Sequence, residues 1–281
     1  MTAPPGGTAT TGAERASGQA AEVSWFDTGE VTLGPADLSD LDSRETARAA
    51  AFVFPADRHR YQVAHVMLRR VLAGHLGTEP GRLTFARQRC PACGGPSGRP
   101  VLAVPPRGDD PPGTPRDADG ARPASRPAPS SRLAGDDGPG LSFSLAHSGE
   151  AVAIAVARAP VGIDVQRQAT GCVCALTSAM HADDAAVVAV LPEPERHLAV
   201  IRWWVRAEAV LKCAGTGIAH GTDTFAVLGA AARGQVPPVP RLSPEPGVPG
   251  RAAAAGYSFA ALAAPRGYQA ALALPAPRAI R

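Results

Sequence analysis

One continuous stretch, FSLAHSGEAVAIAVARAPVGIDVQ, constrains the fold more than any other part of the sequence. It covers residues 143–166, and its small and β-branched residues, broken at Ser-Gly and Ala-Pro, predict strands over 141–166. Two polar side chains stand at the ends of this apolar hairpin, His147 at one and Asp164 at the other. Packing an apolar strand requires neither residue type, so the pair raises the question of a function.

Further elements are expected on both sides of this run. Apolar residues recur with helical spacing most clearly over 57–77, where Gly77 fits a C-terminal stop. A helix is also expected over 38–52, with Ser43 and the Asp and Ser residues before it competing as N-cap. The remaining predictions are strands at 22–31 and 82–88, helices at about 174–190 and 193–214, and strands near 223–229, 256–264 and 267–274.

Composition divides the chain into segments. Residues 1–22 read as a disordered leader, and residues 103–140 are rich in Pro, Gly, Arg and Asp without any aromatic residue. The latter segment cannot bury enough apolar surface to offset chain entropy, so we interpret it as a disordered insertion. We expect an N-terminal half over 23–158 that contains this insertion, a C-terminal half over 159–275, and a tail over 276–281.

Charge and cysteine content exclude some functional classes. The formal net charge is +3 over 281 residues and the charges are mixed, which does not favour nucleic acid binding. No apolar run approaches the roughly 20 residues that span a bilayer, and no secretory signal is visible. Five cysteines favour reduced thiols and a cytoplasmic location. Cys90 and Cys93 have C-x-x-C spacing, and Cys172 with Cys174 could complete a zinc site, although free thiols are the favoured interpretation.

Two short patterns contain candidate functional residues. Asp164 and Gln166 are two apart on a strand, so both point to one side and could approach one hard cation. The alternative is an ordinary aspartate at a strand end. Glu208 and Lys212 are four apart on a helix, and an exposed ion pair there would be worth only about 0.2–0.5 kcal/mol. Lys212 is the only lysine among 28 Lys and Arg residues, and its neighbours are apolar, which favours a functional role.

The order of these patterns resembles a known family. VGIDVQ, followed some forty residues later by WVRAEAVLKCAGTGI, is similar to the signature pair of Sfp-type 4′-phosphopantetheinyl transferases. Upstream, FSLAHSG, SGRPVL and ADRHRYQVAHVMLRRVL resemble weaker motifs of the same family, in the same order. The resemblance covers most of residues 25–275, leaving out the insertion.

The resemblance implies a fold and a reaction. The fold would be α+β, with two similar α/β halves in one chain (a pseudo-dimeric arrangement) and the active site in the cleft between them. The reaction would transfer the 4′-phosphopantetheine arm of coenzyme A to a serine of an apo carrier protein, with Mg²⁺, releasing 3′,5′-ADP. The implied partners are coenzyme A as co-substrate and acyl or peptidyl carrier proteins of fatty-acid, polyketide or nonribosomal-peptide synthesis. We expect a monomer without nucleic acid or membrane partners.

The resemblance also implies roles for individual residues. Asp164, Glu208 and Gln166 match the metal-binding positions, while Glu208, Lys212 and Asp164 would form the catalytic set. Glu208 would help to deprotonate the incoming serine, directly or through water. The residues implied in binding coenzyme A phosphates are Lys212, His147, Arg48, Arg99 and Arg69, with His147 in the 3′-phosphate region.

Three positions depart from the family pattern. Gln166 replaces a common third acidic ligand, Ala207 replaces a common lysine beside which Arg206 could partly substitute, and Ala146 replaces a serine. A catalytically silent relative that binds coenzyme A or a carrier protein is therefore the alternative. An unrelated arginine-rich binding module is a third possibility, which the mixed charges disfavour.

Overall fold

The computed structural model describes residues 10–16, 19–103, 140–168, 173–218, 221–228 and 256–276. The expected insertion, apart from its end residues, and nearly all of the expected tail lie outside these ranges. Part of the expected leader differs from the prediction, because strand β1 (Thr10–Ala16) pairs with strand β2 (Gln19–Asp27) as an antiparallel hairpin. The composition of the leader did not indicate this hairpin.

The first sheet is antiparallel, with strand order β1-β2-β6-β5. Strands β5 (Ser142–Ser148) and β6 (Ala151–Ala157) form the hairpin expected within 141–166, turned at Gly149 with a φ of 54°. Strand β6 alternates branched residues with alanines along its length. Its branched side chains, Val152, Ile154 and Val156, pack with those of helix α3 (Pro55–Leu76).

The N-terminal helices begin and end at residues with clear local causes. Helix α3 starts with a proline at its first turn and ends at Gly77 in the left-handed conformation (φ 62°), which confirms the predicted stop. Helix α2 (Ser43–Ala50) is capped by Asp42, whose carboxylate accepts from the amides of Arg44 and Glu45. The other elements of this part are α1 (Pro35–Leu38), η1 (Pro80–Arg82), β3 (Phe85–Arg87) and β4 (Pro100–Leu102).

The second sheet is also antiparallel, with strand order β7-β9-β8. Its strands are β7 (Gly162–Arg167), β8 (Tyr257–Ala261) and β9 (Tyr268–Pro275). The helices of this part are α4 (Cys174–Thr177), α5 (Ala182–Ala189), α6 (Glu193–Ala214) and the short η3 (Thr222–Thr224). None of the described helices is long and apolar enough to cross a membrane.

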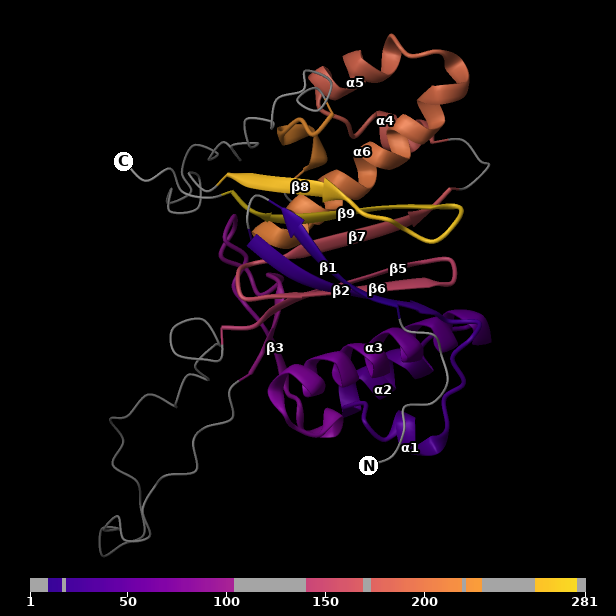
Figure 1. Cartoon of the computed structure of the whole chain (residues 1–281), viewed down its shortest axis with the longest axis vertical. Helices are drawn as coiled ribbons and strands as arrows, with labels where there is room; N and C mark the ends of the chain where they lie inside the picture. Colours follow the sequence, from indigo (N-terminus) through magenta and orange to yellow (C-terminus); the bar gives the residue numbers. More distant parts are fainter. Residues whose placement is uncertain are drawn as a thin grey trace, which may run out of the picture.

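The two sheets stack on each other between the two groups of helices. Figure 1 shows α1–α3 on one side of the strands and α4–α6 on the other. The alanines of β6 pack with Ile163 and Val165 of β7 and with Leu272 and Leu274 of β9. The opposite faces of β7 and β9 pack on α6. The mixed helix and sheet content agrees with an α+β fold, and each sheet is covered by one helix of 22 residues.

The structure corrects two expectations. His147 and Asp164 do not end one hairpin, because His147 is on β5 of the first sheet and Asp164 is on β7 of the second. The strand expected near 223–229 is also wrong. The backbone N–H groups of Val227 and Leu228 donate to the carboxylate of Asp184 at 2.7 Å, so a buried side chain takes the place of a neighbouring strand.

Candidate active site

The packing of β7 against α6 brings the predicted catalytic residues together. Ile163 and Val165 face the other sheet, so Asp164 and Gln166 face α6, as the period of two in a strand requires. The approach is close at Gly162, where an added Cβ would stand 1.9 Å from the backbone oxygen of Ala209. A glycine at this position therefore allows β7 to lie directly on α6.

Lys212 bridges helix and strand. Its Nζ lies 2.7 Å from Asp164 Oδ1 and donates a further hydrogen bond to the backbone oxygen of Ile163 at 3.1 Å. Burial raises the pKa of the Asp164 carboxyl, and the ammonium of Lys212 opposes that rise. The predicted i,i+4 pair of Glu208 and Lys212 is thus part of a larger group, in which Lys212 binds the strand rather than its helical neighbour.

Glu208 is the least satisfied member of this group. Its Oε1 is buried and has no hydrogen-bond partner among the residues that the structure describes. Burial raises the pKa of Glu208, the ammonium of Lys212 lowers it and the nearby carboxylate of Asp164 raises it further. A buried carboxylate oxygen without a partner is costly, and a bound cation would remove that cost.

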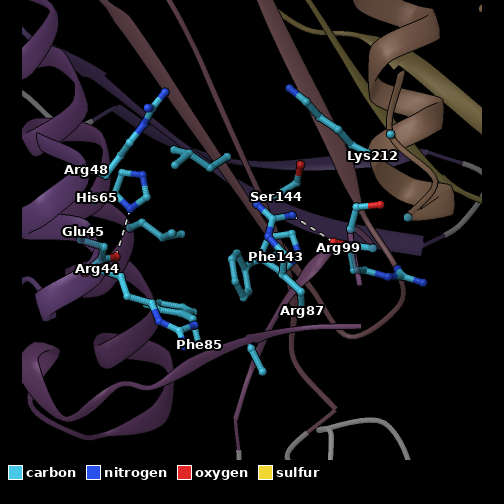
Figure 2. A pocket seen from close by; sticks show the side chains of 18 of the residues that line it. Arg44, Glu45, Arg48, His65, Phe85, Arg87, Arg99, Phe143, Ser144 and Lys212 are labelled. Atoms are coloured by element: carbon cyan, nitrogen blue, oxygen red, sulfur yellow. Dashed lines mark hydrogen bonds and ion pairs between the residues drawn. The ribbon is translucent and has the colours of Figure 1, made fainter. Parts of the chain in front are cut away.

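A cavity of about 780 Å³ opens beside this group, between the two halves of the chain. Figure 2 shows Arg48 and His65 on one side of it and Lys212 and Arg99 on the other, with Arg87 between. Further residues of the wall are apolar or aromatic, among them Tyr61, Leu68, Phe85 and Phe143. The basic rim and partly apolar wall suit an anionic ligand of intermediate size.

The predicted coenzyme A residues occupy different places around this cavity. Arg48 is exposed on α2 and lines the cavity, with its guanidinium 5.1 Å from the centre of the Phe52 ring. Arg99 also lines it and is held by Gln88 Oε1 at 2.9 Å and by the backbone oxygen of Cys213, in the last turn of α6, at 3.2 Å. Both therefore present positive charge to the cavity.

His147 is exposed on β5 and is not part of the cavity wall. Desolvation lowers its pKa, and the positive charges of Lys212, His65 and Arg60 lower it further. Gln166 is half-buried on the α6 face of β7. The roles of His147 and Gln166 stay predictions.

Arg69 does not face the cavity. Its side chain is fully buried, and its guanidinium pairs with Glu45 at 2.7 Å and with Asp42 at 3.3 Å. It also donates to the backbone oxygens of Pro80 and Leu83. The prediction that Arg69 contacts coenzyme A is corrected by this burial, because its donors are already occupied inside the protein.

Arg206 does not take the place of the lysine missing at Ala207. Its guanidinium donates to the backbone oxygen of Val227 at 3.4 Å and lies over the Phe259 ring, with the charge centre 5.2 Å from the ring centre. Ala207 itself is completely buried.

Sequence reasoning missed three residues that line the cavity, namely Arg44, Arg87 and His65. Arg44 and Arg48 are four apart on α2, a spacing that places both on one helix face and could have indicated the first of them. No local pattern marks His65, because its position depends on how α3 meets the sheet.

Three cysteines have described side chains, and all three are free thiols. Cys90 and Cys213 are buried free thiols and Cys93 is an exposed one. Cys172 and the side chain of Cys174 lie outside the described residues. Within the described part of the chain, no group of three or more His, Cys, Asp or Glu residues is arranged to hold a metal ion.

Comparison with known proteins identifies a related sequence. The chain is 29% identical over 182 residues to the 4′-phosphopantetheinyl transferase HetI of Nostoc sp.. This similarity supports a relationship to the phosphopantetheinyl transferases. The aligned region covers 64% of this chain and 61% of HetI, so the chain spans less than two thirds of the relative that it matches. No family model matches the chain.

Proposed function

We propose that the protein is a 4′-phosphopantetheinyl transferase of the Sfp type. It would move the phosphopantetheine arm of coenzyme A to a serine of an apo carrier protein. The observation that carries this proposal is the convergence of Asp164, Glu208 and Lys212 beside a basic cavity, with Glu208 Oε1 buried and unpartnered. The similarity to HetI supports the same activity.

The residues present fit a divalent cation. Asp164 and Glu208 would hold it, with Gln166 as a neutral third oxygen donor directly or through water, since hard cations such as Mg²⁺ prefer oxygen ligands. When bound, the cation would offset the charge of the pyrophosphate during transfer. The unpartnered oxygen of Glu208 is the structural evidence that favours such a ligand.

The transfer needs no reactant besides coenzyme A and the carrier serine. The serine oxygen would form a bond to the β-phosphorus of coenzyme A, and the bond from that phosphorus to the bridging pyrophosphate oxygen would break, so that 3′,5′-ADP leaves with the bridging oxygen. Glu208 would accept the serine proton, directly or through water. Lys212 would neutralise charge on the phosphate oxygens, as a compact cation held in place by Asp164.

Arg48 and Arg99 would hold the phosphates of the nucleotide portion, because both line the cavity. His147 would contribute at the cavity edge. The same proposal includes two similar halves, a monomeric state and a cytoplasmic location. These points rest on the resemblance and on the element order.

The test is the intact mass of apo carrier proteins after incubation with coenzyme A, Mg²⁺ and the purified protein. One carrier each from fatty-acid, polyketide and nonribosomal-peptide synthesis would be used, with EDTA as a control. A gain of one phosphopantetheine that EDTA prevents is the expected result. Binding of coenzyme A without any mass gain would favour the silent-relative alternative, and absence of binding would refute the assignment.

A further inference from the structure

A histidine in the cavity wall is held in an orientation suited to ligand binding. His65 on α3 lines the cavity with 24% of its side chain exposed, and its Nδ1 lies 3.0 Å from Glu45 Oε1. A carboxylate can only accept, so Nδ1 carries the hydrogen and donates to Glu45. The second ring nitrogen, Nε2, is therefore the one that remains for a ligand. Figure 2 shows the ring beside Arg48, with its bond to Glu45 on the side away from the Arg48 guanidinium.

Buried Arg69 fixes the carboxylate that orients this ring. It donates to Glu45 Oε2 at 2.8 Å, which leaves Glu45 Oε1 to accept from His65. Burial alone would raise the pKa of Glu45, but the hydrogen bonds from His65 and Arg69 and from the Asp42 amide hold it below its usual value. Glu45 therefore stays charged and accepts from His65 Nδ1.

The face of the ring is restrained as well. The Tyr61 ring stacks on His65 with centroids 4.1 Å apart and an interplanar angle of 30°. With Glu45 at its edge and Tyr61 on its face, the imidazole has little freedom to rotate. Such restraint is typical of a group that contacts a ligand directly, because little conformational entropy is lost on binding.

The charges around His65 favour an anion. Arg48 lies beside it in the cavity wall, and His147 and Arg60 are near enough for their charges to affect one another. The acidic side chains on this wall are Asp42 and Glu45, and both pair with Arg69. A phosphate entering here would thus meet donors rather than unpaired carboxylates.

We propose that His65 is a substrate-contacting residue that, with a hydrogen on both ring nitrogens in the complex, donates from Nε2 to the 3′-phosphate of coenzyme A. This inference rests on the proposed function. If Lys212 holds the pyrophosphate on one side of the cavity, the only other phosphate of coenzyme A must lie away from it. Arg48 and His65 form the opposite side (Figure 2). Glu45 and Arg69 are positioning residues in this arrangement.

Two substitutions separate ligand contact from structural support. In His65→Asn the amide nitrogen can replace Nδ1 and keep the bond to Glu45, but the Nε2 position is lost. In His65→Gln the amide nitrogen can reach the Nε2 position instead. His75→Asn is the matched control, because His75 is on the same helix, is 27% exposed and also faces a carboxylate, Glu22 at 3.7 Å, but is not part of the cavity wall.

Calorimetric titration with coenzyme A and with dephospho-coenzyme A, which lacks the 3′-phosphate, tests the proposal. We expect His65→Asn to weaken coenzyme A binding about tenfold or more, the loss of one charge-assisted hydrogen bond, and His65→Gln to lose less. Binding of dephospho-coenzyme A should change less than about twofold in every variant, and His75→Asn should match the wild type.

The outcomes are distinguishable. If the wild type fails to bind coenzyme A, the proposed function fails and this inference fails with it. If the wild type binds and His65→Asn binds equally well, or loses both ligands equally, only the role of His65 is refuted. Should His65→Asn unfold, ¹H–¹⁵N spectra of the wild-type histidine rings provide the second measurement. Coenzyme A, but not dephospho-coenzyme A, should then shift the Nε2 resonance of His65 and leave that of His75 unchanged.

Discussion

Replacement of Arg69 by methionine should destabilise the fold strongly, because it leaves a buried carboxylate without its partner. Arg69 is fully buried, and Glu45, its main partner, has only 10% of its side chain exposed. Two backbone oxygens, those of Pro80 and Leu83, would lose a donor at the same time. Methionine retains much of the side-chain volume, so the loss is electrostatic, and breaking one side of a buried ion pair costs about 3–5 kcal/mol.

The neighbouring Arg70 provides a matched control. It pairs with Asp37, but the two side chains are 25% and 18% exposed, so Arg70→Met should cost about 1 kcal/mol or less. Urea unfolding followed by tryptophan fluorescence would compare the two variants. The midpoint should fall by roughly 1–2 M for Arg69→Met and by well under half of that for Arg70→Met.

Equal, small losses in the two variants would refute the reasoning, because they would mean that Glu45 does not depend on Arg69.

Three other predictions follow from the site and its packing. Glu208→Gln should lower the rate of carrier modification about 100-fold or more without unfolding the protein, since it removes charge that a cation needs, and near-normal turnover would exclude Glu208 from the mechanism. Gly162→Ala should lower the melting temperature sharply or prevent folding, because the added Cβ would overlap backbone atoms of α6. The control is Gly74→Ala on α3, where the added Cβ meets nothing within 4 Å and should stabilise the folded protein by about 0.5–1 kcal/mol. Alkylation at pH 8 followed by peptide mass analysis should label exposed Cys93 and spare Cys213. Burial raises the pKa of Cys213 to about 12, so its thiol stays protonated. Labelling of both cysteines at equal rates would contradict the buried position of Cys213.

Local patterns predicted much of the secondary structure. The long helix ending at Gly77, the helix ending in the turn after Lys212 and the hairpin over 141–166 follow from periodicity and glycine chemistry. The strand expected near 223–229 failed for a tertiary reason. Its backbone donors are satisfied by Asp184, some forty residues earlier in the chain, and no local pattern announces such a bond.

For the candidate site, too, local patterns account for one part and tertiary packing for the other. Asp164, Glu208 and Lys212 were predicted from sequence, because strand and helix periods place each on a definite face of its own element. That the two faces meet depends on β7 packing on α6, which the structure shows at Gly162. The ion pair between Lys212 and Asp164, rather than Glu208, is a consequence of that contact.

Sequence alone therefore determined most of the elements that form and which residue types are available to bind phosphate and a cation, since these depend on neighbours within a few positions. Tertiary structure decided which arginines face the cavity and which are buried. Arg48 is on α2 and Arg69 is on α3, yet one lines the cavity and the other holds Glu45 inside the fold. The physical reason is that a buried guanidinium must have its donors satisfied, and the acceptors come from α2 and from the backbone after α3, which only the tertiary packing brings to Arg69.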